Sequence, residues 1–391
     1  MKYLKLLGSV AIASVLALEF SGCGASTSEE PISPYQRIAV LDGSWAEVPA
    51  LAEKIARYVV DTDESAALGY PTNWVVAGAN PASKETFEFE DLLPIPAKGV
   101  STAEGKSRVI ELCNGAYAKQ ATGTGRFHGS ALPCEVSVHS DGSKIYVDML
   151  DADAIFSVFF ADLSAEQKSG LKSVASKVKS EIRGMVLASL VNDTHTVSTK
   201  AMGPSWKSKD IERIALQSPY KVYSYTRTDG GTFKTGTDDK AIAHEIIAAL
   251  GSDAATADTN VAGLSAGSAW RSGRPEPLAI PGVQVVEACS PKYASMATKL
   301  GNEYITALPC EITVLVDEND PTGKTLSISM LDPNFMFSVM FEGAVEKAVT
   351  NKVLTTTEAS AYNTLASTVF ADLKTVVDHT IANSTYKLQS K

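Results

Sequence analysis

The chain has 391 residues, and its 35 basic side chains against 45 acidic ones give a formal net charge of −10. Hydrophobic residues make up 45% of the chain, which is ample for packed cores, and the length predicts two or three domains. The acidic balance argues against non-specific nucleic-acid binding and against electrostatic docking on anionic lipid, since both need a basic surface. After residue 22 no segment reaches 18 consecutive apolar residues, so the sequence predicts no membrane-spanning helix there.

The N-terminus has the pattern of an export signal. Lys2 and Lys5 precede an uncharged run over residues 6–18, which has the length of a signal-peptide core and is too short to span a bilayer as a helix. The following Phe20-Ser21-Gly22-Cys23 resembles the lipobox of bacterial lipoproteins, in which the cysteine thiol accepts a diacylglyceryl group. We therefore expect a signal peptide over 1–22, a lipid anchor on Cys23, and a flexible tether over 23–34 that is rich in small and polar residues.

The next 157 residues predict an α+β unit. Short strands are expected over 37–41, 74–77 and 108–112, and a helix is expected where Val48, Leu51, Ile55 and Val59 recur at helical spacing. Residues 135–139 and 144–149 predict a hairpin that turns at Asp141-Gly142. A long amphipathic helix then places five apolar residues on one stripe, namely Leu171, Val174, Val178, Ile182 and Met185.

The second part of the chain predicts the same order of elements. A first helix is expected around Ile242, Ile246 and Leu250, a hairpin over 312–316 and 325–330, and a last helix along Leu365, Val369, Leu373 and Val376. Hairpin strands that follow one another predict an antiparallel sheet with helices on one face. The stretches 94–106 and 254–274 lack periodicity, and we expect loops there.

An internal repeat is the strongest structural signal in the sequence. Residues 111–118 match 287–294, and 131–135 match 307–311, each 176 positions apart; residues 149–151 and 156–158 match 330–332 and 337–339 at an offset of 181. The two copies also open alike, with Ser-Pro-Tyr at 33–35 and at 218–220. We expect repeat domains over 35–191 and 216–388 with a linker over 192–215, the two copies pairing as an intramolecular pseudo-dimer.

The repeated motif resembles a known family. The pattern Glu-x-Cys-(Asn/Ser)-x-x-Tyr-Ala, then Leu-Pro-Cys, then Leu-Asp is similar to the domain-of-unknown-function family 302, over about four fifths of the chain. Copy two carries prolines at Pro291 and Pro333, as is usual in the family, whereas copy one has Gly115 and Ala152 there. The resemblance implies a small two-layer α/β sandwich, often paired into dimers, and implies no established activity.

Each copy has two cysteines with the same spacing, Cys113 and Cys134 in the first and Cys289 and Cys310 in the second. Strand alternation places Cys134 with Val136 and Val138 on an apolar face. One interpretation is a disulfide in each copy, which an exported chain with an even count of remaining cysteines favours. A second is packed, reduced thiols. A third is a redox or metal site with a nearby carboxylate, although the long spacing is not that of a CxxC pair.

Other polar and aromatic residues are candidates for a ligand site or cleft, with structural roles as alternatives. They are Glu111, Tyr117, Asp151, Glu287, Tyr293 and Asp332. For Asp151 and Asp332, each at the end of a strand and the start of a helix, the alternative role is an N-cap. For the two tyrosines it is core packing. The five histidines are scattered, and we expect surface positions for them, with His139 pointing outward.

Three classes of function are compatible with these residues, and we assign no cofactor and no resident metal. The preferred class is a non-catalytic, lipid-anchored envelope module that binds a small molecule or a protein partner; the loops over 94–106 and 254–274 are its expected site. A second is a thiol- or metal-dependent envelope enzyme that uses the cysteine pairs. A third is a structural component of the envelope. The anchor predicts a periplasm-facing location, and Gly24 after the cysteine favours the outer membrane.

Overall fold

The structure is a computed structural model that describes residues 30–60, 74–76, 94–96, 98, 106–132, 134–251, 261–272, 280–308, 310–316, 320 and 322–391. The expected signal peptide, the expected lipidation site Cys23 and most of the expected tether lie outside the described residues. The end of that tether is folded: Ile32 exchanges two backbone hydrogen bonds with Trp206, at N–O distances of 2.9 and 2.7 Å. The folded body therefore starts at about residue 32.

The first half contains an antiparallel sheet with helices on one face. Its strands lie in the order β2-β4-β5-β6-β1-β7, with β3 beside β4 and β8 beside β1. The hairpin between β5 and β6 turns at Gly142, whose positive φ of 97° suits glycine. The elements before the expected linker are β1 (Tyr35–Asp42), η1 (Trp45–Glu47), α1 (Val48–Val60), β2 (Trp74–Val76), β3 (Pro94–Pro96), β4 (Lys106–Asn114), α3 (Gly115–Thr122), η4 (Arg126–Ala131), β5 (Cys134–Ser140), β6 (Lys144–Leu150), α4 (Ala152–Phe159) and α5 (Ala165–Ser189).

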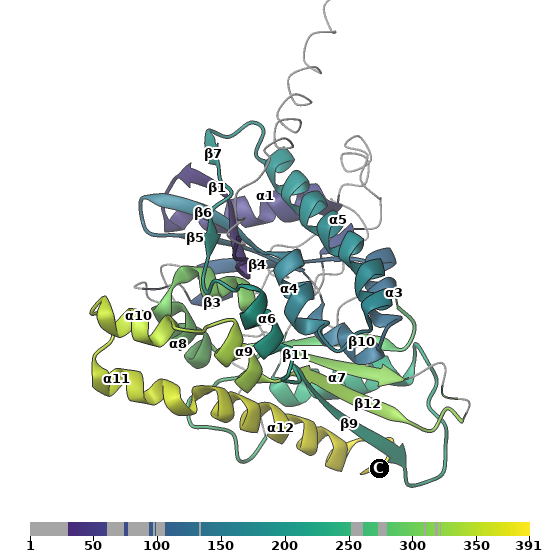
Figure 1. The fold of residues 1–391 in the computed structure, drawn as a ribbon. Helices are drawn as coiled ribbons and strands as arrows, with labels where there is room; N and C mark the ends of the chain where they lie inside the picture. Colours follow the sequence, from purple (N-terminus) through teal and green to yellow (C-terminus); the bar gives the residue numbers. More distant parts are fainter. Residues whose placement is uncertain are drawn as a thin grey trace, which may run out of the picture.

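The second half repeats this plan (Figure 1). Its sheet has the order β10-β11-β12-β9-β13, which corresponds to β4-β5-β6-β1-β7 of the first half. Its elements are β9 (Tyr220–Arg227), α7 (Asp238–Leu250), β10 (Val283–Ala288), α8 (Pro291–Leu300), η5 (Asn302–Ala307), β11 (Cys310–Val316), β12 (Leu326–Leu331), α9 (Pro333–Val339), α10 (Ala344–Thr350), α11 (Thr356–Ser360), η6 (Ala361–Thr364), α12 (Leu365–Asn383) and β13 (Leu388–Ser390). The expected α+β class with two similar halves is confirmed.

The segment between the halves is itself structured. It holds β7 (His195–Val197), β8 (Ala201–Met202) and α6 (Ser208–Ile214). Strand β7 pairs with β1 as β13 pairs with β9, so each repeat ends in an edge strand that returns to its own first strand. The repeat unit consequently extends a few residues into the stretch that the sequence predicted to be a linker.

Each core lies between its sheet and its helices. In the first half, Ile110 and Val136 of the sheet pack with Ile55 of α1 and Ile182 of α5. In the second half, Ile312 and Met330 pack with Ile246 of α7 and Leu373 of α12. Side chains alternate along a strand, so the same strands also present a second face, and that face is buried between the two halves.

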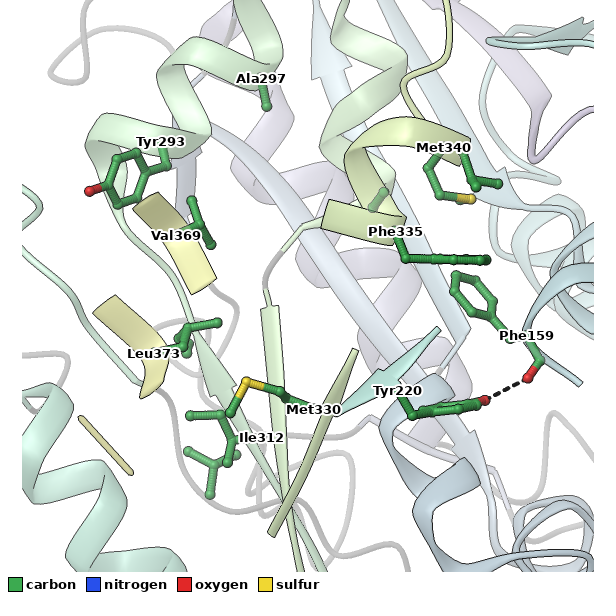
Figure 2. Close-up of a cluster of buried hydrophobic side chains, with 14 of the residues drawn as sticks. Phe159, Tyr220, Tyr293, Ala297, Ile312, Met330, Phe335, Met340, Val369 and Leu373 are labelled. Carbon is green, nitrogen blue, oxygen red and sulfur yellow. Dashed lines mark hydrogen bonds between the residues drawn. The ribbon is translucent and has the colours of Figure 1, made fainter. Parts of the chain in front are cut away.

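The two halves contact each other reciprocally. The Ser130 hydroxyl of η4 donates to Thr313 Oγ1 of β11 over 2.9 Å, and Thr306 of η5, which occupies the place of Ser130, lies 2.8 Å from the Ser137 hydroxyl of β5. The Tyr220 hydroxyl donates to the backbone carbonyl of Phe159 over 2.8 Å (Figure 2). Its counterpart Tyr35 donates to Met340 over 3.2 Å. Such isologous contacts define an intramolecular pseudo-dimer.

Candidate functional site

The first half encloses an apolar pocket between the end of β4, the start of α3, η4, and helices α4 and α5. It holds about 710 Å³ of space, some of it open to solvent. Phe156 and Phe160 from α4 and its C-terminus, with Val174 and Val178 from α5, form the wall opposite the sheet. An apolar lining with few polar groups is typical of small-molecule sites.

The second half has an equivalent pocket of about 750 Å³ between β10, α8, η5, α9 and α12. Figure 2 shows Tyr293 and Ala297 of α8 and Val369 of α12, three of its lining residues, on these neighbouring elements. Many lining positions match between the halves. Six matched pairs are Tyr117 and Tyr293, Ala121 and Ala297, Leu132 and Leu308, Cys134 and Cys310, Phe156 and Phe337, and Phe160 and Phe341.

A tryptophan, a tyrosine and a buried acid stand together at the wall of the first pocket. Trp74 Nε1 donates to Glu181 Oε2 over 2.8 Å, and the Tyr117 hydroxyl donates to Glu181 Oε1 over 2.6 Å. Burial, and then the hydrogen bond to Glu181, raise the pKa of Tyr117 to about 12. The hydroxyl therefore stays protonated at neutral pH and keeps its hydrogen bond to the acid.

The second pocket has the same three groups. Trp270 Nε1 and the Tyr293 hydroxyl both donate to Asp372 Oδ2 over 2.9 Å. Asp372 Oδ1 also accepts from the backbone and the hydroxyl of Ser265, at 2.9 and 2.8 Å. Both predicted tyrosines thus line a pocket, and each is oriented by an acid on the last helix of its own half.

Sequence reasoning missed the two acids and Trp270. Glu181 lies between Val178, Ile182 and Met185 on the apolar stripe of α5, and Asp372 lies in the same way on α12. A buried carboxylate needs hydrogen-bond donors around it. An acid that interrupts an apolar helical stripe was therefore the sequence feature that could have identified these two residues. The sequence pattern did not identify Trp270, because this residue lies in a stretch without periodicity. In the structure its side chain is buried.

Neither expected disulfide is present, because Cys134, Cys289 and Cys310 are free thiols. The strand register gives the reason. Leu112 lies opposite Cys134 on the neighbouring strand, so Cys113 points to the other face of the sheet; Ala288 lies opposite Cys310 in the same way. The structure corresponds instead to the second interpretation, packed thiols.

These thiols are poor nucleophiles. Burial, and then the charge of Glu135, raise the pKa of both Cys134 and Cys310 to about 12. Burial raises the pKa of Cys289 as well. At neutral pH the thiols are neutral, and it is the thiolate that attacks or binds a metal. Within the described residues no group of three or more His, Cys, Asp or Glu side chains has the geometry of a metal site.

Asp151 and Asp332 are N-caps, as their alternative role predicted. Asp151 accepts from the backbone of Asp153 and Ala154 at the start of α4 and pairs with Lys179 at 2.6 Å. Asp332 accepts from Asn334 N at the start of α9. Their helices contribute residues to the pocket walls, so these two acids support the site from outside it.

Glu111 and Glu287 lie away from the pockets, on the sheet faces between the halves. Glu111 is the cross-strand neighbour of Glu135, and Glu287 that of Glu311, and all four are buried. Burial, and then the charge of Glu287, raise the pKa of Glu135 well above its ordinary value. The structure thus places Glu287 close to Glu135 of the other half and separates the predicted glutamates from the predicted tyrosines.

The prediction of surface histidines is wrong for two of the five. His139 is buried because its strand face, which we expected to meet solvent, is covered by the second half; its Nε2 lies 2.8 Å from Asp148 Oδ2. His128 is buried beside Tyr220 of the second half, with the ring centroids 5.4 Å apart. Most of the first expected loop site, over 94–106, lies outside the described residues. Of the second, over 254–274, residues 261–272 are described, and they contribute Trp270 to the wall of the second pocket.

Comparison with known proteins gives a family but no activity. The family model described as Domain of unknown function DUF302 matches residues 97–188 and 276–361, one segment in each half. The chain therefore carries two segments of this family in tandem, over less than half of its length rather than the four fifths expected. No curated protein and no solved structure matches the chain. No helix within the described ranges is long and apolar enough to cross a membrane.

Proposed function

We propose that the chain is a lipid-anchored envelope protein whose two repeats each bind a small, largely apolar molecule in the pocket beside the Trp–Tyr–acid group. The observation that carries this proposal is the match between the two pockets. Many of the same apolar, aromatic and cysteine positions line both cavities. Filling such a space with side chains would stabilise each core by itself, so open space at both places favours binding.

Binding is favoured over thiol chemistry by the state of the cysteines. Cys134 and Cys310 lie in the pocket walls with a pKa of about 12. A neutral thiol contributes to an apolar wall and does not attack a substrate. Glu181 and Asp372, which orient the pocket tyrosines, have their oxygens occupied by the indole and phenol donors. Glu311 lines the second pocket as well.

A binding titration tests the pockets. The probe is N-phenyl-1-naphthylamine, which is uncharged and fluoresces in apolar surroundings. Ala121→Phe and Ala297→Phe should each fill one pocket and halve the number of bound probe molecules, and the double variant should bind none. Ala116→Phe is the matched control, since Ala116 is exposed on the same helix as Ala121. Unchanged binding in the double variant, with the melting temperature preserved, would refute the proposal.

The proposed anchor rests on residues 1–23 and on where the folded body begins. Eight residues lie between Cys23 and Ile32, so the body would lie within about 30 Å of the bilayer surface. More than one acyl chain makes such anchoring stable. We propose a periplasm-facing location, at the outer membrane because of Gly24. Cys23→Ser should release the exported protein from membranes and prevent palmitate incorporation, whereas Cys134→Ser should do neither; membrane retention of Cys23→Ser equal to wild type would contradict the anchor.

A further inference from the structure

Among the matched lining positions at which the two pockets differ, one carries a polar side chain in both halves: Asn114 in the first and Ser290 in the second. Asn114 ends β4 and caps α3: its Oδ1 accepts from the backbone N–H groups of Ala116 and Tyr117, at 3.0 and 3.3 Å. These two contacts fix the orientation of the side-chain amide. The oxygen faces the start of the helix, and Nδ2 is directed away from it.

The Asn114 Nδ2 group has no hydrogen-bond partner, although the residue is only 2% exposed and lines the first pocket. An amide nitrogen carries two N–H donors. Leaving a buried donor unsatisfied costs free energy, and buried polar groups in native proteins are rarely left so. A donor placed in this way at a cavity wall is the group that a bound molecule would satisfy.

The second half has no equivalent donor at this position. The Ser290 hydroxyl caps α8 by accepting from Tyr293 N, and it donates its own proton to the backbone carbonyl of Ser268. Both functions of the hydroxyl are therefore used within the protein. At this position the side chain in the second pocket has hydrogen-bond partners for both its donor and its acceptor, whereas the Asn114 amide nitrogen in the first pocket has none.

The other strong donors at the first pocket are already engaged. The Trp74 indole and the Tyr117 hydroxyl both donate to Glu181. The Cys134 thiol is only a weak donor. Among the described residues that line this pocket there is no lysine or arginine, so nothing there would balance an anionic ligand. The donor and its surroundings together suit a neutral oxygen acceptor.

We infer that the first pocket binds an uncharged apolar molecule that carries a carbonyl oxygen, held by the Asn114 amide, and that the second pocket binds its ligand without such a contact. This inference rests on the proposed function, because it names the ligand chemistry of the same pockets. Asn114 is then the specificity-determining residue of the first half. The fused copies would serve two related ligands that differ in one polar group.

Two probes of matched shape separate the pockets: 2-acetylnaphthalene, which has a carbonyl, and 2-ethylnaphthalene, which has none. Ala297→Phe leaves the first pocket open and Ala121→Phe leaves the second. In the first pocket the ketone should bind about tenfold more tightly than the hydrocarbon, because it satisfies a buried donor. In the second pocket the two affinities should agree. The carbonyl stretching frequency of the bound ketone should fall only in the first pocket.

Two substitutions at Asn114 complete the test in the Ala297→Phe chain. Asn114→Ser installs the capping residue of the second half, and Asn114→Asp keeps a capping oxygen while it replaces the two donors by an acceptor. Both should abolish the preference for the ketone and leave binding of the hydrocarbon unchanged. Gln120→Ala, at an exposed position of α3, should keep the preference.

Three results would overturn the inference: equal affinity of both probes in the first pocket, the same preference in the second pocket, or a preference that survives both Asn114 variants. These failures are distinct from failure of the proposed function. If neither probe bound to either pocket while the filled variants kept their melting temperatures, the binding proposal itself would fall, and the inference with it.

Discussion

The two halves share many pocket residues, whereas part of the face where they touch differs between them. Both pockets keep the Trp–Tyr–acid group, although the acid changes from Glu181 to Asp372. The contact face instead carries a charged network in the first half only. Arg37 pairs with Asp148 at 2.8 Å and His139 approaches the same carboxylate, whereas Val222, Ser329 and Leu315 occupy these places in the second half. The pocket residues retained in both halves are the observation on which the proposed binding function rests.

The largest expected effect comes from breaking the charged network. Asp148 is fully buried, and its removal leaves the Arg37 guanidinium and His139 without their shared acceptor. We expect Asp148→Ala to lower the free energy of unfolding by about 3–5 kcal/mol, the usual cost of breaking a buried pair. Ser329→Ala, the matched change in the second half, should cost about 1 kcal/mol. Urea titrations of both variants measure this, and equal costs would contradict the asymmetry.

The same network predicts a pH dependence. Burial alone would raise the pKa of Asp148, but the hydrogen bonds and charges of His139 and Arg37 outweigh it and leave that pKa below its ordinary value. A lowered folded-state pKa contributes stability that is complete above the unfolded value of about 3.9 and is lost as the pH falls below it. The free energy of unfolding of the wild type should therefore fall as the pH drops below about 4, as urea unfolding at each pH would show. Asp148→Asn should lose less stability over this pH range than wild type. If the stability of the variant fell in parallel with that of wild type, the role of Asp148 in the pH dependence would be contradicted.

The two acids that orient the pocket tyrosines differ in the number of hydrogen bonds that they accept. Asp372 accepts four hydrogen bonds and Glu181 accepts two. Asp372→Asn should therefore lower the free energy of unfolding by about 2–3 kcal/mol and Glu181→Gln by about 1–2 kcal/mol, since an amide nitrogen faces donors in each case. Denaturant unfolding checks the order, and a larger cost at Glu181 would contradict the hydrogen-bond count.

The reciprocal tyrosines sharpen the pseudo-dimer. Tyr35→Phe and Tyr220→Phe each remove one buried hydrogen bond between the halves and should each cost about 1 kcal/mol. Tyr362→Phe removes a hydroxyl-to-carbonyl bond within the second half and serves as the control. Hydrogen exchange should show faster opening of η4 and η5 in the first two variants only. Identical exchange in all three would mean that these bonds do not join the halves.

The smallest effect on stability is expected at the cysteines. With no disulfide to lose, Cys134→Ala and Cys310→Ala should each cost about 1 kcal/mol, well below the roughly 3 kcal/mol of a lost bridge. Because the pKa of both thiols is about 12, iodoacetamide at pH 8 should modify them about three orders of magnitude more slowly than in the unfolded chain. Rapid modification of either thiol in the native protein would contradict their burial.

Much of the fold could be predicted because it depends on local periodicity. The stripe along α5, the hairpin at Gly142 and the repeat itself all follow from short-range patterns. The predictions that were wrong depend on contacts between residues far apart in the sequence. The strand register separates Cys113 from Cys134, and the second half covers His139. Both depend on which strands and faces meet, and the alternation within one strand does not contain that information. The pocket tyrosines were identified from the repeat, whereas Asn114 gained its meaning only when its amide was seen at the cavity wall.

The central claim is that one chain holds two separate, equivalent pockets, and native mass spectrometry with 2-acetylnaphthalene tests it most directly by counting bound molecules. Wild type should bind two, Ala121→Phe and Ala297→Phe one each, and the double variant none, with Ala116→Phe still binding two. A count of one in wild type, or an unchanged count in the double variant, would contradict the account.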